Sequence, residues 1–275
     1  MALLPTAPAR LRNADNDFAY RHDSHFFHLT GFAEPEAWLV LNAEGRSILF
    51  CQPRDEAREI WDGLRVGPER APALLGVDEA HAAQTLDELM PGLLANQASV
   101  WFPFGGCEGL QARVAQWLDA VRRRTREGLT APARQHDLAP VLAGLRLVTR
   151  CGTPARSALA HVRAMRFCAQ RWREGATAIA EHEIEAELLH EFRRHGANGV
   201  AYTPIVAAGA NACILHGRGG QLGLAAPAAS LKQGELCLID AGREHSAWAA
   251  PDPHPVATRA QSPSPANSRP HSPPP

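Results

Sequence analysis

Short apolar runs alternate with longer polar stretches through the first half of the chain. They lie at residues 2–4, 38–41, 47–51 and 99–102. Their length and their aliphatic and aromatic content predict strands, and residues 42–45 predict a turn between the second and third. Residues 78–94 and 109–124 predict helices. The second helix has apolar residues at helical spacing: Leu110, Val114, Trp117, Leu118 and Val121. This alternation of strands and helices predicts an α/β domain.

A helical pattern is also clear in the second half of the chain, between residues 181 and 196. Ile184, Leu188 and Phe192 fall at steps of four on one face, and acidic residues gather in the first turns. Gly196 supplies a stop signal at the C-terminus. The spacing of the two histidines at 190 and 195 is one residue too long for a His-Glu-x-x-His zinc motif.

Two polar side chains follow apolar runs in the second half. Residues 236–239 read as a buried strand that ends at Asp240, and residues 211–215 lead in a similar way to His216. A carboxylate at a strand end either caps a helix or binds a hard cation. Taken alone, His216 is best interpreted as a hydrogen-bonded histidine at the end of a strand.

The last stretch of the chain has a different composition. Nine of the twenty-five residues in 251–275 are proline, and Val256 is the one sizeable aliphatic residue among them. Such a segment buries too little apolar surface to fold. We therefore expect residues 251–275 to be disordered.

Charge and cysteine content narrow the class of protein. Lys and Arg number 28 against 29 Asp and Glu, which gives no electrostatic basis for binding nucleic acid or an anionic membrane. No apolar run approaches the roughly 18 residues of a membrane span, and no signal peptide is recognisable. The six cysteines are scattered without a CxxC pair, which favours free thiols in a reducing cytoplasm. A length of 275 residues suggests about two domains.

Several ordered motifs resemble the aminopeptidase P family, the metal-dependent Xaa-Pro aminopeptidases. The amino-terminal motif comprises Tyr20, Arg21, Ser24, Phe26, Thr30, Gly31, Phe32, Glu34, Pro35, Glu36 and Ala37. It is followed by Arg54-Asp55, Glu59-Ile60-Trp61, and the stretches that lead to His216 and Asp240. The resemblance implies a creatinase/aminopeptidase P-type α/β domain at 1–145, lacking its first helix. An incomplete pita-bread catalytic domain would follow at 146–250, and the disordered tail at 251–275.

The resemblance also implies a chemistry. Family members bind two divalent metal ions, usually manganese, through two Asp, one His and two Glu, and act on peptides with proline second. By this resemblance Asp240 is the first metal ligand and His216 handles a proton. Trp61 would reach toward the active site of a neighbouring subunit in a homo-oligomer; the alternative is an interfacial aromatic residue without a catalytic part.

The sequence departs from the family at two places. Residues 146–160 lack the expected start of a long helix, and the second Asp of the metal set, eleven residues after Asp240, is replaced by Pro251. Loss of two bases from codons for Ala-Ala-Asp-Leu-Thr-Arg-Thr would give Ala249 through His254 and open the codon of Pro255. We therefore expect a truncated or frameshifted copy, inactive as a peptidase, whose strand before Asp240 has an unpaired edge.

Two other functions remain open at this point. The first is a noncatalytic binding or oligomerisation module built on the amino-terminal domain. The second is a prolidase-like dipeptidase of the same fold. The Tyr-Arg … Thr-Gly-Phe and Arg-Asp … Ile-Trp motifs favour aminopeptidase P over that relative.

Overall fold

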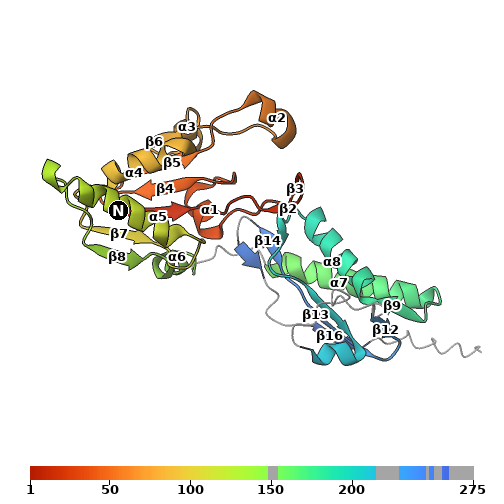
Figure 1. The fold of residues 1–275 in the computed structure, drawn as a ribbon. Helices are drawn as coiled ribbons and strands as arrows, with labels where there is room; N and C mark the ends of the chain where they lie inside the picture. Colours follow the sequence, from red (N-terminus) through yellow and green to blue (C-terminus); the bar gives the residue numbers. More distant parts are fainter. Residues whose placement is uncertain (148–153, 215–228, 246–247, 251–255, 260–275) are drawn as a thin grey trace, which may run out of the picture. The chain divides into compact units, whose positions relative to one another are not determined.

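The computed structural model describes the chain except for residues 148–153, 215–228, 246–247, 251–255 and 260–275 (Figure 1). Internal contacts divide the chain into two compact units, Met1–Thr149 and Arg150–Pro275. The domain boundaries expected at 145/146 and 250/251 stay a prediction. Within the described part of the chain, no helix is both long and apolar enough to cross a membrane.

A six-stranded sheet forms the centre of the first unit, in the order β6-β5-β4-β1-β7-β8 (Figure 1). Its strands are β1 (Ala2–Pro5), β4 (Trp38–Leu41), β5 (Ser47–Cys51), β6 (Glu79–Ala82), β7 (Ser99–Phe102) and β8 (Arg134–Asp137). β4 runs antiparallel to both of its neighbours, β1 and β5. The pairs β5–β6, β1–β7 and β7–β8 are parallel. The strands expected at 2–4, 38–41, 47–51 and 99–102 are confirmed, and so is the α/β class.

Helices cover both faces of this sheet. The helices of the first unit are α1 (Ser24–Thr30), α2 (Glu56–Asp62), α3 (Ala71–Leu75), α4 (Leu86–Leu94), α5 (Leu110–Arg123) and α6 (Ala139–Leu145). α4 and α5 pack on one face through a core that includes Met90 and Trp117. α1, α3 and α6 pack on the other face, where Phe26 and Leu142 are buried. All five apolar residues predicted to face the core from 109–124 are buried.

The helix expected at 78–94 is wrong in its first part. Glu79–Ala82 is strand β6, which pairs with β5, and Ala83–Thr85 is a short 3-10 helix before α4. The apolar positions of β6 are only alanines, so the sequence carries little of the β-branched signal that identifies a strand. Pairing with β5 decides the conformation instead.

Three elements of the first unit, two short strands and α2, contribute no buried residue to its cores. β2 (Leu11–Asn13) and β3 (Asn16–Asp17) form a small exposed hairpin. α2 contains no buried residue at all, and in Figure 1 it lies at the end of a loop that extends away from the sheet. Hydrophobic packing therefore does not hold α2 in place.

The second unit combines two helices with short strands. The helices are α7 (Pro154–Arg173) and α8 (Glu181–Arg194). The strands are β9 (Ala178–Ala180), β10 (Gly199–Val200), β11 (Ile205–Ala208), β12 (Ser230–Lys232), β13 (Leu236–Asp240), β14 (Arg243–His245), β15 (Trp248–Ala250) and β16 (Val256–Arg259). Ile184, Leu188 and Phe192 of α8 are buried as predicted, and they pack with residues of α7, β11 and β13. The second unit is thus built around one core.

The expectation of disorder is wrong for four residues of the tail. Val256–Arg259 forms β16, which pairs antiparallel with β13 from Leu236↔Arg259 to Ile239↔Val256. β13 is consequently the central strand of the order β11-β13-β16 and not an edge. An open edge of β13 needs backbone partners, and these four residues contain no proline to prevent the pairing.

Candidate functional site

Asp240 is the last residue of β13, as the sequence predicted. Along this strand Cys237 and Ile239 are buried in the core, while Asp240 is half-buried. Tyr202 donates a hydrogen bond from its hydroxyl to Oδ1 of Asp240 at 2.5 Å. Asp240 also lies opposite Ile205 of β11, so strand register and one side-chain contact together fix its place.

His216 lies outside the described residues, but the chain that leads toward it is well defined. β11 continues into a 3-10 helix at Gly209–Cys213. Glu181, the first residue of α8, is almost fully buried, and its Oε1 accepts hydrogen bonds from the backbone N of Ala208 at 2.7 Å and from Asn211 Nδ2 at 3.1 Å. Glu181 therefore anchors the segment that precedes His216.

The described side chains do not fit a two-metal ligand set. Among the residues that the structure describes, no group of three or more His, Cys, Asp or Glu could hold a metal ion. Asp240 is a single carboxylate, and one of its oxygens already accepts a hydrogen bond from Tyr202. Pro251, where the family resemblance predicts the second carboxylate, lies outside the described residues and has no ligating side chain. No catalytic step through a metal follows from this arrangement.

The polar residues between α7 and α8 bind one another. Arg163 donates to Glu187 at 2.6 Å and to Glu191 at 3.3 Å, and Glu191 Oε1 lies 2.8 Å from His195 Nε2. Burial opposes ionisation of Glu191, but the hydrogen bond with His195 and the charge of Arg163 lower the pKa of Glu191 below its usual value. A hollow of about 430 Å³ borders this cluster. Because its charges are mutually paired, we assign the cluster a structural role.

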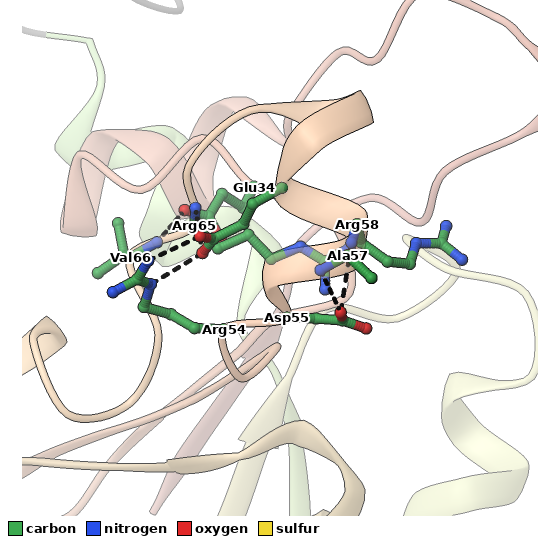
Figure 2. A network of polar contacts seen from close by, with 8 residues as sticks. Glu34, Arg54, Asp55, Ala57, Arg58, Arg65 and Val66 are labelled. Carbon is green, nitrogen blue, oxygen red and sulfur yellow. Dashed lines mark hydrogen bonds and ion pairs between the residues drawn. The ribbon is translucent and has the colours of Figure 1, made fainter.

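Trp61 lies on α2, in the first unit, and its side chain is 87% exposed. We call the segment from Arg54 to Val66, which contains α2, the α2 arm. Figure 2 shows the polar contacts at its base. Arg54 donates from Nε and Nη2 to both carboxylate oxygens of Glu59, at 2.8 and 2.7 Å. Asp55 caps α2 by accepting from the backbone N of Ala57 and Arg58. Trp61 and Asp240 are in different units, and His216 is not described.

Sequence reasoning missed several residues that position these groups. Tyr202 contacts Asp240, and Glu181 contacts the segment that leads to His216. Glu59 contacts Arg54 within the α2 arm. None of the three was predicted to act there. The acidic residues at the start of α8 were interpreted only as favourable to the helix dipole. Glu181 directly follows β9 and begins α8, and this position in the sequence could have indicated that its side chain binds nearby backbone.

Comparison with known proteins identifies both units. Residues 1–101 match the family model "Aminopeptidase P, N-terminal domain", and residues 155–251 match "Metallopeptidase family M24". The Xaa-Pro aminopeptidase of Escherichia coli is 37% identical over 261 residues, a match that covers 90% of this chain and 56% of that protein. The Xaa-Pro aminopeptidase of Haemophilus influenzae is 35% identical, over 86% of this chain and 52% of that protein.

Solved structures agree with these relatives. Aminopeptidase PepP of Pseudomonas aeruginosa aligns with a TM-score of 0.83 and 37% identity, over 94% of this chain and 57% of that one. Zinc-substituted E. coli aminopeptidase P in complex with product aligns with a TM-score of 0.83 and 34% identity. This alignment covers 94% of this chain and 58% of that one. The chain thus spans about half the length of the relatives that it matches. With matches in both of its units, the chain belongs to the Xaa-Pro aminopeptidase (aminopeptidase P) family of M24 metallopeptidases.

Proposed function

We propose that this chain carries the amino-terminal part of a manganese-dependent Xaa-Pro aminopeptidase, which releases an N-terminal residue that precedes proline. The observation that supports it most is the place of Asp240, at the end of β13 inside the stretch that matches the M24 model. In this proposal Asp240 is the first metal ligand and His216 handles a proton, as the family resemblance implies. Peptides with proline second are the substrate class.

We further propose that residues 1–275 alone do not hydrolyse such peptides. A two-metal centre needs several oxygen and nitrogen ligands, and Pro251 offers none at the position of the second carboxylate. One carboxylate that is also hydrogen-bonded to Tyr202 gives weak metal affinity at best. Resequencing codons 249–255 of the gene tests whether Pro251 arises from a shifted reading frame.

A metal titration combined with a peptidase assay tests this function. The purified chain is titrated with Mn²⁺ and with Zn²⁺ by calorimetry and is then given a peptide with proline second. An Xaa-Pro dipeptide is assayed in parallel, to detect a prolidase-like activity. We expect no saturable binding of two metal ions and no product above the metal-only blank.

Asp240→Ala is the informative variant, and Asp119→Ala is its control, because Asp119 is an exposed carboxylate of α5 paired with Arg122. Metal-dependent release of the first residue that is lost in Asp240→Ala and kept in Asp119→Ala would show an active enzyme. That result would overturn the proposed inactivity. Cleavage of the dipeptide alone would instead favour the prolidase-like alternative.

A noncatalytic role of the first unit is the second candidate, and the α2 arm favours it. Ile60, Trp61 and Leu64 are 81%, 87% and 78% exposed on this arm. Exposed clusters of large apolar side chains commonly mark interaction sites. We propose that Trp61 contacts a second copy of the chain in a homo-oligomer, as its counterpart in the family does. Sedimentation of the chain and of Trp61→Ala tests this, and a wild-type chain that stays monomeric would overturn it.

We also propose that the protein works in a reducing cytoplasm. The five described cysteines, Cys51, Cys107, Cys168, Cys213 and Cys237, are all free. Burial raises the pKa of Cys51 and of Cys237 to about 12, so neither thiol is reactive at neutral pH. Thiol labelling in freshly lysed cells tests the proposal, because disulfide-bonded chain would contradict it.

A further inference from the structure

Val66, at the end of the α2 arm, packs against the core of the first unit, but the apolar side chains of the helix and of Leu64 lie outside that core. α2 contributes no buried apolar residue, and Ile60, Trp61 and Leu64 are largely exposed. A seven-residue helix is too short to be stable in isolation. Apolar packing of α2 itself therefore does not determine where Trp61 lies.

Glu59 joins the two ends of the arm. Its carboxylate accepts two hydrogen bonds from Arg54, at the start of the arm, and a third from the backbone N of Arg65, at its end, at 3.2 Å. Figure 2 labels Arg54 and Arg65. Although α2 is exposed, the side chain of Glu59 is only 5% exposed. The adjacent backbone N of Val66 donates to Glu34 Oε1 at 2.7 Å, which ties the end of the arm to the loop before β4.

Gly67 shows that Arg54 has a defined place in this arrangement. Its φ of +68° lies in the left-handed region, and a Cβ there would lie 2.9 Å from Cγ of Arg54. The chain that leaves the arm thus passes directly against the stem of Arg54. The stem of Arg54 thus lies against the backbone at Gly67, and its guanidinium binds the carboxylate of Glu59.

The pair has the features of a strong ionic contact. An arginine that donates two parallel hydrogen bonds to one carboxylate is fixed in direction as well as in distance. The hydrogen bonds from Arg54 lower the pKa of Glu59 to about 2, so Glu59 is ionised at neutral pH. Lysine at position 54 would keep the charge but lose this two-point geometry.

We propose that Arg54 and Glu59 are positioning residues that fix the direction in which the α2 arm presents Trp61 to a second copy of the chain. This proposal rests on the proposed contact of Trp61 between copies. An arm that is already ordered before docking loses less conformational entropy on binding, and the network supplies that order. Arg54 and Glu59 act through Trp61 and need not touch the partner.

Hydrogen–deuterium exchange of the full chain tests the ordering. Glu59→Gln removes the ionic contact, and Arg54→Lys removes its two-point geometry. Glu56→Gln is the matched control, the same chemical change at an exposed position of α2 whose charge acts on Arg54 less strongly than that of Glu59. We expect exchange in the peptide covering 54–66 to rise about tenfold in Glu59→Gln, less in Arg54→Lys and least in Glu56→Gln. Equal exchange in Glu59→Gln and wild type would overturn the proposal.

A double-mutant cycle on self-association tests the link to Trp61. We expect Glu59→Gln to weaken association about tenfold in the wild-type background and to have no further effect in Trp61→Ala, because both changes remove one contact. Independent, additive effects would show that Glu59 does not act through Trp61. If the wild-type chain does not associate, the contact between copies fails, and the exchange experiment still decides whether Arg54 and Glu59 order the arm.

Discussion

Different interactions determine the positions of Trp61 on the α2 arm and of Asp240 at the end of β13. Asp240 stands at the end of a strand whose buried neighbours pack against α7 and α8, and its place follows from the register with β11. Trp61 stands on a helix with no buried residue, and charged contacts at the base of the arm orient it. Changes in packing should therefore displace Asp240, whereas changes in charge should displace Trp61.

The largest expected effect is a cavity in the core beneath β13. Phe192 is 1% exposed in the cluster that includes Ile239. Phe192→Ala should destabilise the second unit by about 3–5 kcal/mol, through lost burial and an unfilled cavity. Hydrogen exchange in the peptide covering β13 measures this.

Phe26→Ala is the matched control in the first unit, because Phe26 is fully buried in the core beneath α1. It should raise exchange in β4 and β5 and leave the β13 peptide unchanged. Wild-type exchange of β13 in Phe192→Ala would contradict the view that the core positions Asp240.

This contrast also explains what could be predicted from the sequence. Apolar spacing reveals which residues face a core, so α5, α8 and the strand before Asp240 were predicted correctly. The contact of Arg54 with Glu59 left no such trace, because oppositely charged residues on a surface usually contribute little and have no period.

Backbone pairing was the other feature that sequence reasoning missed. β6 has only alanines at its apolar positions, and β16 lies within a proline-rich stretch. In both strands the partner, β5 or β13, supplies the hydrogen bonds that the local composition does not predict. Composition describes what a segment can bury by itself, and it does not describe a neighbouring strand with a free edge.

A smaller effect should follow from removing the polar contact to Asp240. Tyr202→Phe deletes the hydroxyl that donates to Oδ1 of this carboxylate, and we expect a loss of about 1–2 kcal/mol in the second unit. Urea unfolding, monitored by hydrogen exchange of the peptide that covers β13, measures this loss of stability. The chain has one other tyrosine, so Tyr20→Phe is the control.

Tyr20 donates to the backbone O of Ala7 in the first unit, and its loss should leave the β13 peptide unchanged. An equal response of that peptide to both variants would show that the hydrogen bond to Asp240 has no local effect.

Acid should loosen the arm. The folded-state pKa of Glu59 is lowered to about 2 from a usual 4.5, so its contribution is complete above about pH 4.5. It is lost progressively as the pH falls from there toward 2. Exchange in residues 54–66, corrected for the intrinsic rate at each pH, should therefore rise several-fold over this range.

Glu59→Gln should remove that pH dependence, and Glu56→Gln should retain it. A wild-type arm with constant corrected exchange from pH 5 to 2 would contradict the assignment of Glu59 as the ionic contact of the arm.

The smallest expected effect on stability comes from Trp61 itself. Because its side chain is 87% exposed and packs in no core, Trp61→Ala should change the free energy of unfolding by no more than about 0.5 kcal/mol. Trp117→Ala, at a buried tryptophan of α5 that also donates to Asp87, should cost about 3–5 kcal/mol. Circular dichroism during urea unfolding compares the two. A large loss in Trp61→Ala would mean that this tryptophan supports its own domain, and its exposure would then be no argument for a partner. If Trp61→Ala leaves the free energy of unfolding unchanged but abolishes self-association, Trp61 has no function in folding and serves recognition alone.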